Sequence, residues 1–266
     1  TLNYQALKNG SPVSDALVVE VPVQLFIEEE PLTVSMCTPT HIREWAFGIL
    51  FTEGIIRSAE QVVSYSEEIE EHQITIRVAL ANAAHAVTNK RSLLSVSACG
   101  ICGKTAFEPK TRSDNREADD ELRSMTPSDD RVADDEQSSM VLRDSISTMM
   151  VKLREAQVLF EETGGCHAAG VFNKNLELLF ASEDIGRHNA VDKVIGALVL
   201  NGQLRDAKFI MVSGRVSYEI IAKTFAAGIP TLAAVSSPSS LAVDYAKELG
   251  ISLFAFCREN RITQYA

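Results

Sequence analysis

The sequence contains no run of apolar residues that approaches the roughly eighteen needed for a membrane-spanning helix. Its amino end, from Thr1 onward, also lacks the basic and then apolar pattern of a secretory signal. Hydrophobic residues nevertheless make up 45% of the chain, which is enough to form a substantial core. We therefore expect a folded cytoplasmic protein that does not associate with membranes.

Cysteine is scarce as well. Five cysteines in 266 residues, an odd number without regular spacing, exclude the disulfide framework of small secreted domains. Cys99 and Cys102 form a Cys-X-X-Cys pair, but the chain has no second pair and no His-X-X-X-His to complete a structural zinc site. A zinc deaminase requires His-X-Glu followed by Pro-Cys-X-X-Cys, whereas His167 lies after the pair and no Glu follows it at that spacing. We predict no bound metal.

Positive charge is also in short supply. The formal net charge of −11 argues against binding to nucleic acid, because phosphates need a cationic surface. Residues 108–139 hold eleven acidic and five basic side chains and almost nothing bulky and apolar, so we predict a solvated, disordered insertion there. The insertion divides the chain into an amino-terminal subdomain, residues 1–107, and a carboxyl-terminal domain, residues 140–266.

The amino-terminal subdomain has an α+β pattern. Strands are predicted at 17–27, 32–37 and 72–80, and a helix is predicted through 42–50. Thr38 or Thr40 can cap that helix, and Gly54 can end it. The subdomain then leads into the Cys-X-X-Cys loop.

The carboxyl-terminal domain has an α/β pattern. A long helix is predicted through 142–160, followed by a hairpin that turns at 173–175. After it, helices at 191–202, 217–227 and 241–249 alternate with apolar strands at 209–212, 231–235 and 251–256. This alternation predicts right-handed crossovers and a buried layer of parallel strands.

Polar residues follow three of these strands. The first strand is followed by Ser213, Gly214 and Arg215, the second by the serines of 236–239, and the third by residues 257–261 with two arginines. Because ligands bind outside the carboxyl ends of parallel strands, these turns predict a site for a phosphate-bearing ligand. Helix caps and solvated arginines explain any single turn, but the coincidence of three favours a site.

A second polar cluster, residues 183–189, precedes a predicted helix. The start of a helix accounts well for Asp184 and Gly186. It accounts less well for the three polar residues that follow, Arg187, His188 and Asn189. The residues leave a structural and a functional role equally open. For His167, a positioned polar side chain is favoured over a metal ligand.

The Cys-X-X-Cys pair itself has three ordinary uses: half of a metal site, a redox dithiol, or a nucleophile with a resolving partner. A thioredoxin-like pair opens a helix after the first strand of a domain, whereas Gly100 and Gly103 indicate an accessible loop here. Such a loop suits a sulfur relay in which one cysteine carries a persulfide, and Lys104 could favour the thiolate. Two buried packing cysteines would fit these polar and glycine neighbours poorly.

Several of these motifs together resemble those of the FdhD family, the formate dehydrogenase accessory sulfurtransferases. The motifs are residues 51–56, 97–104, 183–193, 213–219 and 256–261. They occur in the family's order, and the resemblance extends from about Val18 to Arg261 with the acidic insertion as an interruption.

The resemblance implies a specific function. Members take sulfur from a cysteine desulfurase and pass it to the molybdenum cofactor, bis-molybdopterin guanine dinucleotide, before that cofactor enters formate dehydrogenase. By motif position, Cys99 would carry the persulfide and Cys102 would be its partner. The cofactor-binding segment would comprise Phe256, Cys257, Arg258, Glu259, Asn260 and Arg261.

The resemblance also implies a three-layer α/β/α cytidine-deaminase-like domain, a cytoplasmic location and a homodimer. A non-catalytic chaperone that binds the cofactor for a molybdenum or tungsten enzyme is the alternative function.

Overall fold

The computed structural model describes residues 1–81, 135–258 and 261–266 of the protein. Over that part, the chain folds into a mixed α/β structure with sheets of two, four and six strands. The Cys-X-X-Cys pair and most of the predicted acidic insertion lie outside the described residues. The predictions made for them therefore stay predictions.

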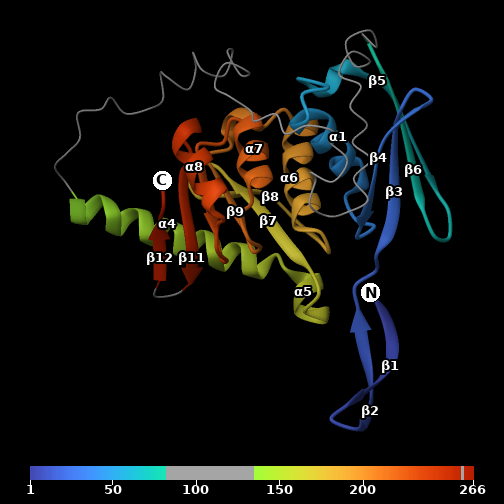
Figure 1. Ribbon diagram of the computed structural model, residues 1–266, viewed down its shortest axis with the longest axis horizontal. Coiled ribbons are helices and arrows are strands. Elements are labelled where there is room, and N and C mark those ends of the chain that lie inside the picture. Colours follow the sequence, from blue (N-terminus) through green and yellow to red (C-terminus); the bar gives the residue numbers. More distant parts are fainter. Residues whose placement is uncertain (82–134, 259–260) are drawn as a thin grey trace.

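The amino-terminal part forms a hairpin and a four-stranded sheet. The hairpin pairs β1 (Leu2–Lys8) with β2 (Ser11–Leu17) and extends away from the rest of the molecule (Figure 1). The sheet has the order β4-β3-β6-β5 and consists of β3 (Val21–Ile27), β4 (Glu30–Cys37), β5 (Val62–Ile69) and β6 (Ile74–Leu80). The three strands predicted in this part are found as β3, β4 and β6, whereas the hairpin was not predicted.

The carboxyl-terminal part forms the six-stranded sheet, in the order β12-β11-β10-β9-β7-β8. Its strands are β7 (His167–Phe172), β8 (Leu178–Asp184), β9 (Phe209–Val212), β10 (Thr231–Ala234), β11 (Ser252–Arg258) and β12 (Arg261–Gln264). The predicted parallel strands are confirmed as β9, β10 and β11, and the predicted hairpin as β7 and β8. The antiparallel pairings of β7 with β9 and of β12 with β11 were not predicted.

Helices connect the strands at nearly all of the predicted positions. They are α1 (Ile42–Thr52), α4 (Asp135–Glu155), α5 (Val158–Thr163), α6 (Arg187–Asn201), α7 (Tyr218–Ala226) and α8 (Ser240–Leu249), with short 3-10 helices η1 (Ala59–Gln61) and η3 (Leu204–Asp206). In the part of the chain that the structure describes, no helix has the length and apolar composition to cross a bilayer.

Two local predictions about helices were wrong. The helix predicted through 142–160 is broken, because the Glu183 carboxylate accepts hydrogen bonds from the backbone N–H groups of Leu159 and Phe160, each at 2.7 Å, and holds the start of α5. Neither predicted threonine caps α1, whose N-cap is His41 in a left-handed conformation. The Thr38 hydroxyl instead accepts a hydrogen bond from the backbone of Ile185 at 3.1 Å.

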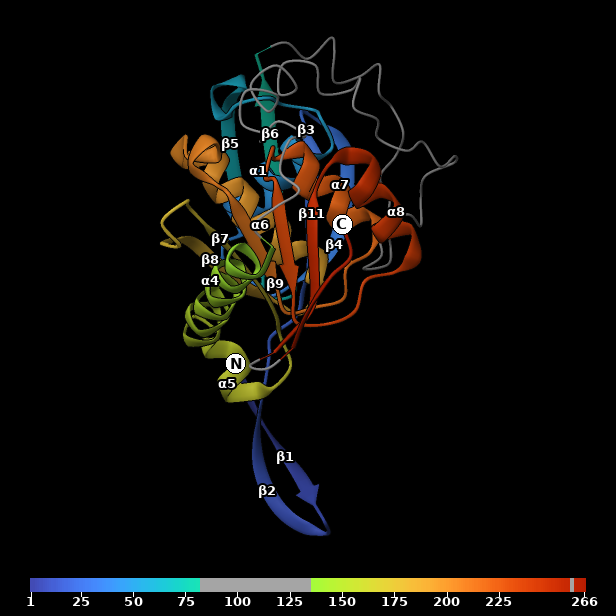
Figure 2. The ribbon, with the colours of Figure 1, turned by 90° about the vertical axis from the view of Figure 1, so that its left-hand side faces the viewer.

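Helices cover both faces of the six-stranded sheet (Figure 2). Alternate residues of each strand point to opposite sides, so Ile210 and Val212 join the core on the side of α6 and α7. Met211, between them, joins Met149 and Leu153 of α4 on the other side. The sheet therefore separates two apolar layers and presents its strand ends at the rim.

The two parts of the chain are joined where α1 crosses α6. A side chain at Gly48 would overlap the backbone carbonyl of Asp192, and a side chain at Gly196 would overlap that of Glu44. The helices therefore touch backbone to backbone. The apolar core runs without interruption from the four-stranded sheet, through α1 and α6, to the six-stranded sheet.

Candidate functional site at the carboxyl edge of the six-stranded sheet

The turns that follow β9, β10 and β11 lie together, as the sequence predicts. The backbone N–H of Val216 donates to the carbonyl of Ser237 at 3.0 Å, which joins the first turn to the second. The N–H of Phe256 donates to the carbonyl of Ser236 at 3.1 Å, which joins the second turn to the third strand. The expected convergence is found for the first two turns, and β11 lies beside the second, whereas residues 259–260 of the third turn lie outside the described residues.

The antiparallel strand β7 brings His167 to the same edge. Ser213 donates its backbone N–H to the carbonyl of Ala168 at 2.9 Å, and its hydroxyl accepts from the N–H of Ala168 at 2.8 Å. Since β7 begins where β9 ends, His167 lies beside the turn of residues 213–215.

The polar cluster of residues 183–189 belongs to this edge too. The start of α6 packs directly on Gly214: a Cβ placed there would lie 3.1 Å from the Cβ of Arg187 and 3.3 Å from Nδ1 of His167. Sequence reasoning treated the two clusters separately because it could not see that β7 is antiparallel to β9. The structure makes them one site.

Some members of the cluster have a structural role. Asp184 and Lys193 are fully buried and form an ion pair at 2.6 Å. The Lys193 ammonium also donates to the carbonyl of Thr38 at 2.9 Å, and the N–H of Thr38 donates to Asp184 at 3.0 Å. Asn189 donates to the carbonyl of Met36 at 2.8 Å. These groups tie α6 to the amino-terminal part.

A second ion pair joins α6 to α7. Lys223 of α7 contacts Asp192 at 2.7 Å, and Asp192 also accepts from the Thr52 hydroxyl at 3.1 Å. Burial raises the pKa of Asp192 above its ordinary value, although the Lys223 charge opposes that rise. For Lys223, burial favours the neutral amine, but the charges of Asp192 and Glu53 raise its pKa overall.

Two arginines at the edge differ from these paired lysines. Among the described residues, neither Arg187 nor Arg215 forms an ion pair, and Nε of Arg187 is buried without an acceptor. Burial, and then the charges of Arg187 and Arg215, lower the pKa of His167 below its ordinary value. Two arginine charges therefore lie close to His167 at this edge.

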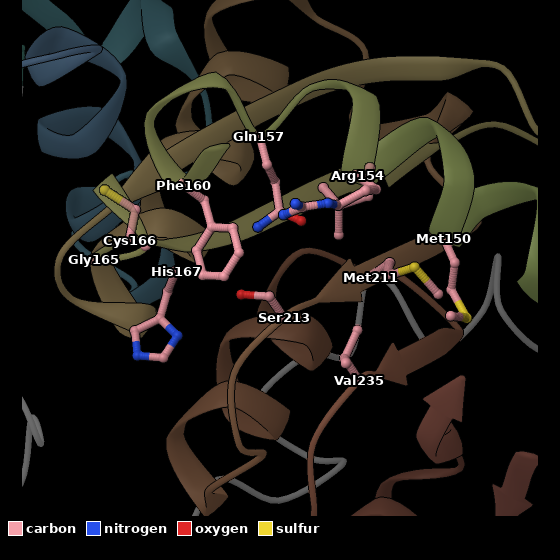
Figure 3. Close-up of a pocket in the computed structure, with 12 residues that line it drawn as sticks. Met150, Arg154, Gln157, Phe160, Gly165, Cys166, His167, Met211, Ser213 and Val235 are labelled. Carbon is pink, nitrogen blue, oxygen red and sulfur yellow. The ribbon is translucent and has the colours of Figure 1, made fainter. Parts of the chain in front are cut away.

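A cavity of about 490 Å³ opens between this edge and the helices α4 and α5. Its lining residues are Met150, Leu153, Arg154, Gln157, Phe160, Gly164, Gly165, Cys166, His167, Met211, Ser213 and Val235. Figure 3 shows Arg154, Gln157 and Phe160 on the helical side, facing Ser213 and Val235 on the sheet. The Arg154 guanidinium lies over the Phe160 ring at 4.9 Å.

The helical wall of the cavity was missed by the sequence analysis. A continuous helix through 142–160 would have carried Phe160 to a different position. Glu183 is the residue that could have indicated this wall. Its carboxylate had no partner in the sequence analysis, and in the structure it holds the start of α5.

The predicted cofactor-binding segment at 256–261 is described in part. Phe256 has a positive φ of 52°, and Arg261 lies over its ring at 4.5 Å. Arg258 faces Arg261 across the end of the β11–β12 pair. The Cys257 side chain is fully buried in the core between α4 and the sheet, so it does not face the edge. Glu259 and Asn260 lie outside the described residues.

The three described cysteines are buried thiols. Burial raises the pKa of Cys166 to about 11, with the charges of Glu183 and Asp184 as further causes. Burial also raises the pKa of Cys257 to about 11 and that of Cys37 well above its ordinary value. The thiol form of Cys166 and of Cys257 therefore predominates at neutral pH. Cys99 and Cys102 lie outside the described residues. No three His, Cys, Asp or Glu side chains gather as metal ligands within residues 1–81, 135–258 and 261–266.

Comparison with known proteins gives a consistent result. The family model described as the FdhD/NarQ family matches residues 18–266. The chain is 40% identical over 257 residues to a protein named sulfur carrier protein FdhD from Nocardia farcinica, covering 95% of this chain and 86% of that protein. It is 34% identical over 264 residues to a protein of the same name from Saccharolobus solfataricus, covering 95% and 89%.

A solved structure with a similar fold covers nearly the whole chain. It is described as a candidate formate dehydrogenase accessory protein from Desulfotalea psychrophila, with a TM-score of 0.68, and the match covers 99% of this chain and 95% of that one. At 22% sequence identity, this likeness shows a common fold.

Proposed function

The chain belongs to the FdhD/NarQ family, and we propose that it is a sulfur carrier that supports formate dehydrogenase. It accepts persulfide sulfur from a cysteine desulfurase and delivers it to bis-molybdopterin guanine dinucleotide, the substrate that receives the sulfur. The relatives named sulfur carrier protein FdhD support the general role. The transfer steps and the identity of the acceptor are our proposal.

One observation carries the proposal: the strand ends form a single polar edge beside a cavity, and no thiol described there can act as a nucleophile at neutral pH. The edge combines Ser213, Gly214 and Arg215 with the start of α6. Such an arrangement suits a large anionic acceptor. Cys166, in the cavity wall, has a pKa of about 11 and stays protonated. The sulfur therefore travels on the Cys-X-X-Cys pair.

The sulfur is loaded by thiol–disulfide chemistry. The Cys99 thiolate attacks the terminal sulfur of the desulfurase persulfide, and the desulfurase cysteine leaves as a thiolate. Cys99 then carries the persulfide. Attack of the Cys102 thiolate on the Cys99 sulfur releases HS⁻ to the acceptor and leaves a Cys99–Cys102 disulfide, which a dithiol reductant returns to two thiols.

The acceptor is held at the carboxyl edge of the sheet. Ser213, Gly214 and Arg215 contact its phosphates, and the segment from Phe256 to Arg261 contacts the remainder of the dinucleotide. We assign the described residues Phe256, Arg258 and Arg261 to this surface because they lie near the end of β11 and at the start of β12. The protein acts as a cytoplasmic homodimer, and its larger domain is of the cytidine-deaminase-like type.

The test is to load the protein with sulfur and locate it. The protein is incubated with a cysteine desulfurase, cysteine and pyridoxal phosphate, and the added sulfur is mapped by mass spectrometry. We expect one added sulfur on Cys99, and we expect Cys99→Ala to abolish the labelling. Cys37→Ala serves as the matched control, because Cys37 is a fully buried thiol in β4, and it should leave the labelling unchanged.

A second measurement separates sulfur transfer from simple cofactor binding. Formate dehydrogenase activity is measured in cells that lack the endogenous protein and are supplied with each cysteine variant in turn. Loss of activity with Cys99→Ala supports transfer. Full activity with both Cys99→Ala and Cys102→Ala would contradict it and favour a cofactor-binding chaperone.

A further inference from the structure

The hairpin of β1 and β2 projects from the molecule and exposes apolar side chains. It extends away from the other elements in both views (Figure 1, Figure 2). Every residue of β1 is exposed, and Leu2, Tyr4 and Leu7 are 54%, 51% and 71% exposed. At the base of the hairpin, the Thr1 hydroxyl donates to Glu162 of α5 at 2.6 Å, and β2 contacts α5. A lone two-stranded hairpin is only marginally stable in water, so this one needs a further strand or a surface to cover it.

The turn of the hairpin determines which backbone groups point outward. It consists of Asn9 and Gly10, which both have positive φ, and it joins Lys8 to Ser11. The residues that flank such a turn form a hydrogen-bonded pair, and bonded and non-bonded pairs alternate along an antiparallel ladder. Residues 3, 5 and 7 of β1 therefore direct their N–H and C=O groups away from β2, and residues 12, 14 and 16 of β2 direct theirs away from β1.

The two outer edges of the hairpin differ in how well they resist pairing. Residue 12 is a proline, which removes a backbone donor from the outer edge of β2 and protects that edge. Strand β1 contains no proline, and its one charged residue, Lys8, lies beside the turn. Among the described residues, no strand pairs with the outer edge of β1. That edge is therefore open to a strand from another chain.

The sequence of β1 is complementary to itself. In an antiparallel pair of two β1 strands centred on Gln5, Tyr4 of each copy lies opposite Ala6 of the other, on one face of the sheet. The outward backbone groups of residues 3, 5 and 7 then meet those of residues 7, 5 and 3. Lys8 lies opposite Leu2, so no like charges face each other across the pair. A second copy of this chain therefore fits the open edge.

The distribution of charge also favours contact through the hairpin. Residues 1–17 contain one basic and one acidic side chain, Lys8 and Asp15, which cancel, whereas the whole chain has a formal net charge of −11. The net charge therefore lies outside the hairpin. Two copies of an acidic protein repel each other, and the hairpin is a part of the surface where they can meet without that repulsion.

We infer that β1 of one copy pairs with β1 of a second copy in antiparallel orientation, about a twofold axis at Gln5. The two hairpins then form one four-stranded sheet, which has the three or more strands that independent stability requires. The assembly closes at two copies, because the twofold pair uses both β1 edges and leaves the proline-bearing β2 edges outside. The inference deepens the homodimer of the proposed function, because it assigns the surface that joins the copies.

The experiment measures dimerisation of the full chain by analytical ultracentrifugation over a series of concentrations. We expect the parent protein to form a dimer. Gln5→Pro should raise the dissociation constant of the dimer at least tenfold, because it removes an outward N–H at the centre of the pair and leaves the bonds to β2 in place. Ser14→Pro is the matched control. Ser14 lies opposite Gln5 in the hairpin and directs its N–H to the other outer edge, so dimerisation should be unchanged.

An exchange of charges tests the twofold axis without proline. Gln5→Lys and Gln5→Glu each place like charges opposite each other, and each variant alone should dimerise about threefold or more weakly than the parent. An equal mixture of the two variants brings unlike charges together, and it should dimerise at least as tightly as the parent. No gain on mixing would contradict an axis at Gln5.

Three further results would overturn the inference: a parent protein that stays monomeric at every concentration, an unchanged dimer in Gln5→Pro, or equal weakening by Gln5→Pro and Ser14→Pro. Sulfur loading of Cys99 is measured on the same samples. Dimerisation as expected without sulfur loading of the parent would contradict the sulfur-carrier function alone. Normal loading with a dimer that Gln5→Pro does not weaken would contradict this inference alone.

Discussion

Basic side chains around α6 fall into two groups that the protein treats in opposite ways. Lys193 and Lys223 lie beneath the surface, and each contacts a carboxylate, at 2.6 and 2.7 Å respectively. Arg187 and Arg215 lie at the rim of the sheet and have no carboxylate partner among the described residues. Paired cations serve the fold, and unpaired cations at a strand edge are available to a ligand. The following predictions test that division.

The largest effect is expected for Lys193→Met. The substitution leaves the Asp184 carboxylate fully buried without its counter-charge, and removing one partner of a buried ion pair typically costs about 3–5 kcal/mol. The free energy of unfolding from urea denaturation measures the loss. A loss below about 1 kcal/mol, the value typical of an exposed ion pair, would show that the pair does not hold the two parts together.

A smaller loss is expected for Lys223→Met. Burial already raises the pKa of Asp192, so its carboxyl group can take up a proton when the ammonium is removed, and it keeps the bond from Thr52. We expect a loss of about 1.5–3 kcal/mol in the free energy of unfolding at pH 7. The loss should shrink as the pH is lowered toward 5, because protonation relieves the unpaired charge. A loss that grows on acidification would contradict this explanation.

The buried cysteines are a further kind of titratable group, because burial favours their neutral thiol form. The folded pKa values of Cys166 and Cys257, about 11, lie above their ordinary value of 9.0, so the thiol form contributes stability below pH 9 that is lost as the pH rises toward 11. Cys166→Ala and Cys257→Ala should each reduce the fall in unfolding free energy between pH 8.5 and roughly 10, by up to about 1.4 kcal/mol per pH unit. Parallel pH profiles for variant and parent would contradict the raised pKa values.

The smallest effect on stability is expected at the rim. Arg187→Gln and Arg215→Gln remove charges that have no partner in the described protein, so the free energy of unfolding should change by no more than about 0.5 kcal/mol. A large loss of stability in either one would place that arginine in the structural group with Lys193 and Lys223.

Much of the carboxyl-terminal fold could be predicted because its pattern is local. The strand at 209–212 matches β9, and the apolar spacing of Val191, Val194, Ile195 and Leu198 locates α6 on the core. The meeting of the turns after β9 and β10 also followed, since parallel strands end at the same edge. Even the unpredicted hairpin had a signal, because Leu2, Tyr4 and Ala6 alternate with polar residues.

The rest depended on contacts between residues distant in the sequence. No local pattern reports that Glu183 caps a helix start at Val158, that β7 is antiparallel to β9, or that Asp184 pairs with Lys193 beneath Thr38. These contacts decide which members of the polar cluster at 183–189 are structural. The sequence identifies the cluster, but only the packing shows that Asp184 and Asn189 have a structural role whereas Arg187 lies at the rim.

The crossing of α1 and α6 also affects how readily these two helices unfold locally. Gly48 and Gly196 place backbone against backbone, so no layer of side chains exists in which one helix could slide or rotate past the other. The amide hydrogens of both helices should therefore exchange with solvent at a common, slow rate, set by unfolding of the whole molecule. Because α6 is held rigidly against α1, the rim where α6 begins should also be rigid. The arginines at that rim would then be in position before a ligand binds.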